Sequence, residues 1–261
     1  MTSLDRYRVV MTGGSRGIGQ GVARLLCAEG ATVVSLDQRP GEETAGLAGR
    51  GFHHVEADVS EPGDVERAFA AADELLGGPP HGLVCVAGIA PEVAFLDTTP
   101  DVLDRVLAVN VRGPFLCGQQ AARRMAEAGG GRIVNIASTA SVQAWSLQTA
   151  YGASKGAVAL LTKNMAVELA PLGIAVNAVG PGTIDTPLAV NMTGNRAWAD
   201  HDLSRTPAGR WGTPDDIAVA VRFLLRDAQW LTGQVLYVDG GFLATGGPML
   251  DSLGGHVSIE R

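Results

Sequence analysis

The chain has 261 residues, of which 46% are hydrophobic, and its 20 basic and 27 acidic side chains give a net charge of −7. This length and composition are typical of a globular domain that folds without disulfides or metal ions. The acidic balance, without any Lys/Arg cluster, argues against nucleic-acid binding. The apolar runs are strand-sized, far below the roughly 18 residues of a membrane helix, so no membrane partner is expected.

The three cysteines, Cys27, Cys85 and Cys117, form no CxxC pair, and their number is odd. A disulfide framework is therefore not expected. The five histidines also lack ligand spacing, so no metal site is predicted. The first residues carry no apolar signal region. We expect a cytoplasmic protein with free thiols.

Short β-branched segments alternate along the chain with longer segments of helical periodicity. Strands are predicted at residues 8–12, 31–36, 52–59, 82–87, 131–136, 174–179 and 234–238. Helices are predicted at residues 17–29, 61–76, 101–128, 151–170 and 214–226. This alternation predicts an α/β fold: one doubly wound Rossmann-type domain over residues 1–261, with a seven-stranded parallel sheet flanked by helices. Residues 186–210 interrupt the alternation as a substrate-loop insertion, and residues 243–261 form a C-terminal tail outside it.

A glycine-rich loop, TGGSRGIG, joins the first predicted strand to the first predicted helix. Gly13 permits a tight turn, and Gly17 and Gly19 permit close approach of a phosphate and of the helix to the strand. The helix N-terminus offers free N–H groups to a pyrophosphate. Such a loop alone is as consistent with an ordinary turn. Asp37, however, ends the next strand 18 positions after Gly19, close to the offset at which an acid meets an adenosine ribose.

A tyrosine and a lysine, Tyr151 and Lys155, stand four residues apart at the start of a long predicted helix and share one face of it. A lysine held there can lower the tyrosine pKa electrostatically, which suits a proton-exchanging phenol. Only three tyrosines and two lysines occur in the chain, so chance is a weak explanation of the pair. Ser138 follows the fifth predicted strand, at the sheet edge where ligands bind in open α/β folds. Alone, it would be interpreted as a capping serine.

Taken together and in order, these motifs resemble the short-chain dehydrogenase/reductase family, to about Gly241. The glycine loop matches its TGxxxGxG pattern, Asp58-Val59 its adenine-contacting pair, and Val109-Asn110-Val111 its asparagine segment. One segment departs from the pattern, because Cys85-Val86 replaces the family's Asn-Asn before Ala87-Gly88. We expect local repacking there, with the backbone contacts to the cofactor retained.

The resemblance implies an NAD(P)-dependent enzyme that transfers hydride between a CH–OH group and nicotinamide. Tyr151 would be the acid/base, Lys155 would tune it and bind the nicotinamide ribose, Ser138 would hold the substrate oxygen, and Asn110 would support a water relay to Lys155. The cofactor residues implied by the loop and the resemblance are Gly13, Ser15, Arg16, Gly17, Ile18, Gly19, Asp37, Asp58, Val59, Ala87, Gly88, Asn110, Tyr151, Lys155, Pro181, Gly182, Ile184 and Thr186. In the resembling family the apolar faces of the two longest helices are covered by partner subunits, so a homotetramer is expected.

The substrate is expected to be a small secondary alcohol or its ketone, such as a polyol or sugar. The pocket is predicted along residues 140–148 and 186–205, with Ser138, Trp145, Gln148, Trp198 and His201 as candidate lining residues. A 3-oxoacyl-thioester (acyl-carrier-protein) reductase using NADPH is the alternative enzyme, and a non-catalytic nucleotide-sensing protein is the alternative of another class. The fold alone excludes neither.

The choice between NAD and NADP depends on opposing charges. The Asp37 carboxylate can bind the ribose hydroxyls of NAD and would repel the 2′-phosphate of NADP. Arg16 and Arg39 could each bind that phosphate, but Arg39 is expected to turn outward before Pro40. Because a repulsive contact can set specificity firmly, we predict NAD, with NADP as the alternative.

Overall fold

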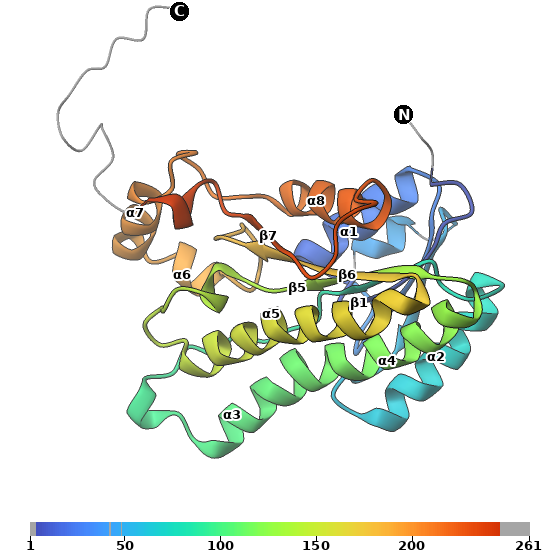
Figure 1. Cartoon of the computed structure of the whole chain (residues 1–261). Coiled ribbons are helices and arrows are strands. Elements are labelled where there is room, and N and C mark those ends of the chain that lie inside the picture. Colours follow the sequence, from blue (N-terminus) through green and yellow to red (C-terminus); the bar gives the residue numbers. More distant parts are fainter. Residues whose placement is uncertain (1–3, 42, 48, 246–261) are drawn as a thin grey trace, which may run out of the picture.

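The computed structural model describes residues 4–41, 43–47 and 49–245, and these residues form a seven-stranded parallel sheet (Figure 1). The strands are β1 (Arg8–Thr12), β2 (Thr32–Asp37), β3 (Phe52–Glu56), β4 (Gly82–Cys85), β5 (Gly131–Ile136), β6 (Ile174–Pro181) and β7 (Val235–Val238). Their order across the sheet is β3-β2-β1-β4-β5-β6-β7. The predicted α/β fold is therefore confirmed.

Helices cover both faces of the sheet. They are α1 (Gly17–Ala28), α2 (Pro62–Leu76), α3 (Pro100–Leu107), α4 (Gly113–Glu127), α5 (Thr149–Leu169), α6 (Val190–Thr193), α7 (Arg196–Ser204) and α8 (Pro214–Arg226). In Figure 1, α1 and α8 lie on one face, and α2, α4 and α5 lie on the other. Val9 and Met11 of β1 enter the core beneath α1 and α8, whereas Val10 enters the opposite core, as the two-residue period of a strand requires.

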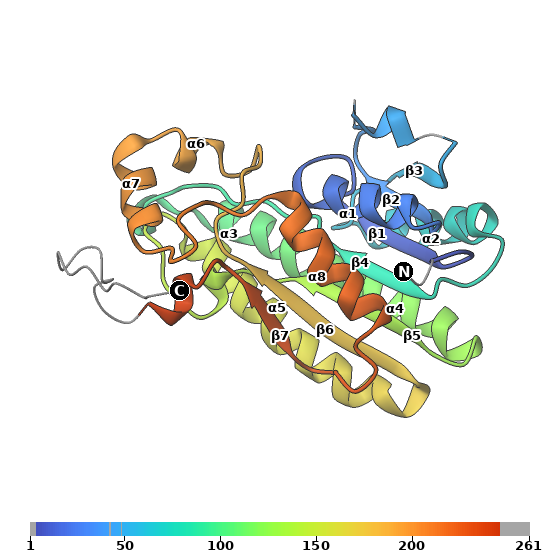
Figure 2. The same ribbon diagram turned by 90° about the horizontal axis from the view of Figure 1, so that it is seen from above.

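The connections of β1 position the cleft. This strand pairs with β2 on one side and with β4 on the other, so the direction of the crossovers reverses there. A reversal of this kind opens a crevice at the carboxyl ends of parallel strands. Figure 2 shows α6 and α7 together at one end of the sheet.

Several element boundaries differ from the sequence prediction. β3 ends at Glu56 rather than at residue 59. β4 ends at Cys85 rather than at residue 87. The N–H of Val86 still donates to the Thr12 carbonyl, and the Thr12 hydroxyl accepts the N–H groups of Val86 and Ala87. The long helix predicted at residues 101–128 is α3 and α4 joined by a π-helical turn at Ala108–Arg112.

The segment 186–210, predicted as an irregular insertion, contains α6 and α7. Most of the predicted tail, residues 246–261, lies outside the described residues. Within the described ranges, no helix is long and apolar enough to cross a membrane.

Candidate active site

The glycine loop and the start of α1 form a cradle at the carboxyl end of β1. Gly13 has a φ of +69°, and a Cβ there would come within 2.7 Å of the backbone nitrogen of Ala87. Gly17 has a φ of +54°, and a Cβ there would approach the Thr186 side chain to 3.3 Å. The first turn of α1 holds no acidic residue and receives no side-chain cap from Arg16. Bare backbone and uncapped N–H groups fit the pyrophosphate of a dinucleotide.

Most predicted site residues line a single cleft that runs from this cradle along the sheet edge. These residues are Gly13, Arg16, Gly17, Ile18, Asp37, Asp58, Val59, Ala87, Gly88, Ser138, Trp145, Gln148, Tyr151, Lys155, Pro181, Gly182, Ile184 and Thr186. The structure thus brings together residues that are far apart in the chain.

Five predicted residues do not line the cleft. Ser15 is buried beside it, Gly19 packs against the backbone of the glycine loop, and Asn110 is buried behind the cleft wall. Trp198 lies behind Trp145, and His201 is exposed on α7. The structure therefore does not place Trp198 or His201 in the cleft lining, and Trp198 packs on Trp145.

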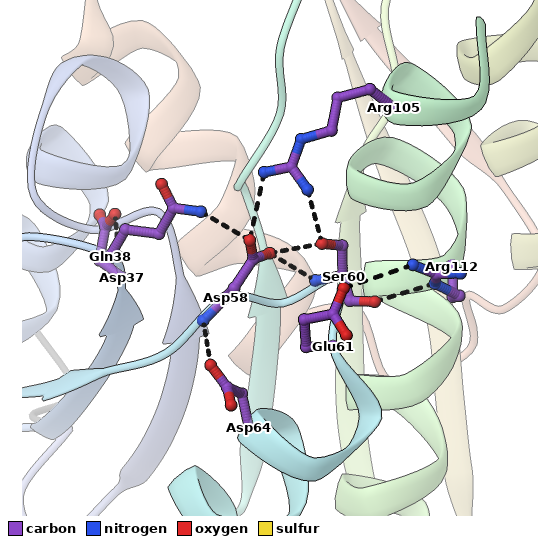
Figure 3. Close-up of polar contacts among 8 residues, drawn as sticks. All are labelled: Asp37, Gln38, Asp58, Ser60, Glu61, Asp64, Arg105 and Arg112. Carbon is purple, nitrogen blue, oxygen red and sulfur yellow. Dashed lines mark hydrogen bonds and ion pairs between the residues drawn. The ribbon is translucent and has the colours of Figure 1, made fainter. Parts of the chain in front are cut away.

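One end of the cleft holds a dense polar network around Asp58 (Figure 3). One carboxylate oxygen accepts hydrogen bonds from the Gln38 amide at 2.8 Å and from the Arg105 guanidinium at 3.2 Å. The other accepts the N–H and the hydroxyl of Ser60. Burial tends to raise the pKa of Asp58, but these hydrogen bonds outweigh it and hold the pKa below its usual range. Asp58 is therefore a fixed negative charge.

Asp37 supplies a second carboxylate at this end. Its two oxygens accept backbone hydrogen bonds from Ser15 at 3.1 Å and from Gln38 at 2.9 Å. Arg16 lines the same end, whereas Arg39 is exposed and outside the lining. The position of Arg39 agrees with the outward turn expected before Pro40.

Tyr151, Ser138 and Lys155 converge at the carboxyl end of β5. The Lys155 ammonium donates a 2.7 Å hydrogen bond to the carbonyl of Ile136 and lies 5.6 Å from the centre of the Tyr151 ring. Ser138 follows two residues after Ile136, and its hydroxyl accepts the N–H of Ala140. Tyr151 and Lys155 belong to the first turns of α5. The end of β5 and the start of α5 therefore hold Ser138, Tyr151 and Lys155 in place.

The pKa values of these groups are governed by burial. Burial lowers the pKa of Lys155 to about 8, and Cys85 acts weakly in the opposite sense. Burial also raises the pKa of Tyr151, against a hydrogen bond with Ser138 that lowers it. The net direction for Tyr151 is upward, opposite to the lowering by lysine that the sequence predicted. The physical reason is that Tyr151 is partly buried in the cleft wall, while the Lys155 ammonium is directed at the carbonyl of Ile136.

Asn110 fixes the wall opposite Lys155. Its side chain accepts the N–H of Ile89 at 2.9 Å and donates to the carbonyl of Ile89 at 2.9 Å and to the Ser154 hydroxyl at 3.0 Å. Ser154 in turn donates to the backbone carbonyl of Tyr151. Gly88 lies between the two functional groups, since a Cβ there would be 3.3 Å from the Asn110 oxygen and 3.8 Å from the Lys155 nitrogen. Asn110 thus connects the segment at Ile89 with the helix turn that carries Tyr151.

Aromatic rings form a wall at the other end of the cleft. Trp145 lines the cleft, stacks on Phe242 at 5.2 Å and lies 5.8 Å from Trp198. The Arg205 guanidinium also lies over the Phe242 ring, 4.6 Å from its centre. Gln148 is buried and lines the cleft next to this wall.

Among the lining residues that the sequence analysis did not predict, Gln38, Glu92 and Arg105 carry a charged or amide side chain. Arg105 lies four residues before Val109, which places both residues on one helical face. This spacing could have predicted that Arg105 also lines the cleft. Gln38 follows Asp37 directly. Glu92 follows β4 in a segment without periodicity, and no sequence signal marks it. Within the described residues, no group of His, Cys, Asp and Glu is placed to hold a metal ion.

Comparison with known proteins shows the family of the chain. Residues 13–243 match the family described as enoyl-(acyl carrier protein) reductase. The chain is 37% identical over 257 residues to a short-chain dehydrogenase/reductase of Armillaria gallica, covering 93% of this chain and 98% of that protein. It is 39% identical over 249 residues to 2-(S)-hydroxypropyl-CoM dehydrogenase 3 of Xanthobacter autotrophicus, covering 90% and 96%.

Among solved structures, a gluconate 5-dehydrogenase from Burkholderia cenocepacia, crystallised with NADP and tartrate, superposes with a TM-score of 0.87 at 36% identity. That match covers 93% of this chain and 97% of the other. The parallel sheet, the glycine cradle and these matches over nearly the whole length lead to one conclusion. The chain belongs to the short-chain dehydrogenase/reductase family and is an NAD(P)-dependent oxidoreductase that acts on CH–OH groups.

Proposed function

We propose that the protein interconverts a small secondary alcohol, such as a polyol or sugar, and its ketone, with NAD as the hydride acceptor and Tyr151 as the acid/base. The observation that carries this proposal is the convergence of Tyr151, Ser138 and Lys155 at the carboxyl end of β5, inside the cleft. Ligands of open α/β sheets bind at this edge.

Each of the three side chains has a separate task. Tyr151 takes the proton of the substrate hydroxyl during oxidation and returns it during reduction. Ser138 donates a hydrogen bond to the substrate oxygen and orients it. The Lys155 ammonium, 5.6 Å from the tyrosine ring centre, stabilises the phenolate electrostatically. The dinucleotide, when bound, supplies the carbon that accepts or returns the hydride.

Asn110 acts as a positioning residue in this proposal. It fixes Ile89 and, through Ser154, the backbone of Tyr151. Its side chain is occupied by these contacts. The proposed water relay to Lys155 would therefore run past Gly88, the residue between Asn110 and Lys155.

The proposed preference for NAD follows from the fixed carboxylate of Asp37. Two backbone N–H groups hold this carboxylate at the end of β2, where the adenosine ribose of a bound dinucleotide is expected. A 2′-phosphate there would meet a like charge. Arg16 is the opposing group, because it lines the same end of the cleft.

A cytoplasmic homotetramer of two-fold symmetry is the proposed assembly. Its support is apolar surface on the two helices for which partner subunits were expected. Phe115 on α4 and Leu160 and Val167 on α5 are 44%, 60% and 77% exposed, respectively. In the proposed tetramer these apolar side chains would be covered by partner subunits.

The proposed function is tested by mixing the purified protein with NAD or NADP and a panel of secondary alcohols, polyols and sugars, while recording absorbance of the reduced cofactor. Reduction of NAD by at least one alcohol is expected. Turnover confined to 3-oxoacyl thioesters with NADPH would support the alternative reductase instead. Cofactor binding without turnover of any panel member would support the nucleotide sensor.

A further inference from the structure

The charged side chains that line the cleft are unevenly distributed. Among the described residues, Arg16, Asp37, Asp58 and Arg105 are all at the adenosine end. The remaining charged lining residues are Lys155, whose ammonium is bonded to the Ile136 carbonyl, and Glu92. Beyond the catalytic lysine, the substrate end therefore has a negative charge and no cation to offset it.

Glu92 belongs to a segment that is fastened on both sides. Asn110 binds both the N–H and the carbonyl of Ile89. At the other side, the N–H of Val93 donates a 2.8 Å hydrogen bond to the carbonyl of Leu147. The backbone that carries Glu92 is therefore anchored to the walls of the cleft.

Val93, the neighbour of Glu92, connects this segment to the part of the cleft where the substrate is expected. Val93 forms a bridge with Gln148, which lines the cleft. Leu147, between Gln148 and the aromatic wall, has a φ of +63°, a strained value for a residue with a side chain. Strain of this kind persists only where surrounding contacts enforce it, so the bridge is a defined feature of the site.

Arg205, a cation next to the aromatic wall, does not reach the cleft lining. Arg205 stacks on Phe242, and Phe242 stacks on Trp145, which is the ring that lines the cleft. Arg205 is outside the lining. An anionic group on a substrate would thus meet Glu92 without a compensating guanidinium.

We propose that Glu92 is a specificity-determining residue that excludes anionic alcohols, so that the substrate is a neutral hydroxylated compound or one with a cationic group. This inference rests on the proposed function, because it concerns the substrate of that reaction. It disfavours a hydroxy acid such as gluconate. The net charge of −7 acts in the same direction at longer range.

The test uses three matched ligands: cyclohexanol and its 4-carboxylate and 4-ammonium derivatives. Their dissociation constants are measured by ligand-observed NMR with protein loaded with NADH, a complex that cannot oxidise an alcohol. At low ionic strength the carboxylate should bind about fivefold or more weakly than cyclohexanol, and the ammonium compound at least as tightly as cyclohexanol. Added salt should narrow these differences.

The isosteric Glu92→Gln variant should reduce the gap between carboxylate and cyclohexanol to within about twofold, since it removes one charge at constant size. Asp97→Asn is the matched control, because Asp97 is exposed like Glu92 and lies further along the same connection, but does not line the cleft. The Asp97→Asn variant should show the same difference in dissociation constant between the carboxylate and cyclohexanol as the wild type.

Three outcomes would overturn the inference: equal or tighter binding of the carboxylate, a gap that survives Glu92→Gln, or no binding of any of the three ligands. A carboxylate preference that disappears in Arg205→Gln would assign the anion to Arg205 instead. Turnover of the same three alcohols with NAD and NADP is recorded separately. Failure of turnover counts against the proposed function, whereas the order of the dissociation constants tests whether Glu92 excludes anionic ligands.

Discussion

The carboxylate of Asp37 accepts a 3.1 Å hydrogen bond from the backbone N–H of Ser15. This contact joins the end of β2 to the glycine loop across 22 positions of the chain. Its other oxygen accepts the N–H of Gln38, so the charge cannot swing away from the cleft without losing two hydrogen bonds. The position of this charge gives the first prediction.

Asp37→Ser should shift cofactor preference from NAD toward NADP by about tenfold or more, because a like-charge contact with the 2′-phosphate is removed while Arg16 remains. The measurement is kcat/KM for both cofactors with one alcohol. Arg39→Gln is the control and should leave the ratio unchanged, since Arg39 is exposed outside the cleft. A wild-type protein that prefers NADP would show that Arg16 outweighs Asp37.

Tyr151→Phe should lower kcat by about 10²–10⁴-fold, because the phenolic proton is lost while the ring remains. NADH binding, followed by fluorescence, should persist. Tyr237→Phe is the matched control. It removes a hydroxyl that lies 3.0 Å from Ser141, outside the cleft, and should retain activity. Near-normal oxidation by the Tyr151 variant would remove tyrosine from its proposed role.

The low pKa of Lys155 predicts a specific pH dependence of stability. Its pKa is about 8 in the folded protein, below the usual 10.5, so between these pH values the unfolded chain holds a proton that the folded chain has released. Under this condition the free energy of unfolding rises with pH. Well below pH 8, Lys155 is protonated in both the folded and the unfolded chain, so its contribution to the free energy of unfolding does not change with pH.

The measurement is chemical denaturation of wild type and Lys155→Met from pH 6 to pH 10. The stability of the wild type relative to the variant should be flat below about pH 7 and should rise from pH 8 upward. Lys163→Met makes the same substitution at an exposed position on α5, and its difference from wild type should stay constant. A flat Lys155 difference would mean that the ammonium is not destabilised by burial.

Arg105→Gln should raise the KM for NAD several-fold with little change in kcat, because Arg105 holds Asp58 and Ser60 at the adenosine end, remote from the reacting atoms. Arg112→Gln is the control. Arg112 binds the Ser60 carbonyl from the same helical segment but does not line the cleft. Equal effects of the two substitutions would indicate a role in stability rather than in cofactor binding.

Light scattering at micromolar concentration should give the mass of four chains. Leu160→Glu should reduce this mass, because a charge would be buried in the proposed interface on α5. Leu75→Glu, on the exposed side of α2, should leave the tetramer intact. A monomeric wild type would refute the proposed assembly.

The sequence by itself determined the features that depend on local spacing. The alternation of β-branched and helical segments determined the parallel sheet, because each element must bury its apolar face. The glycine loop followed from the backbone freedom that a turn next to a phosphate requires. The Tyr151–Lys155 pair followed from the helical period, which places residues four apart on one face.

Only the tertiary structure decided the features that join distant segments. Asp58 and Arg105 are 47 positions apart, and α3, α4 and β5 all lie in the chain between Val93 and its bridge partner Gln148. The π-helical turn at Asn110 accompanies contacts with Ile89 and Ser154, which no local pattern encodes. The tertiary structure also decided that the pKa of Tyr151 is raised rather than lowered. Burial is a property of the whole packed chain, and its free-energy cost for a charged group outweighs the attraction that spacing alone suggests.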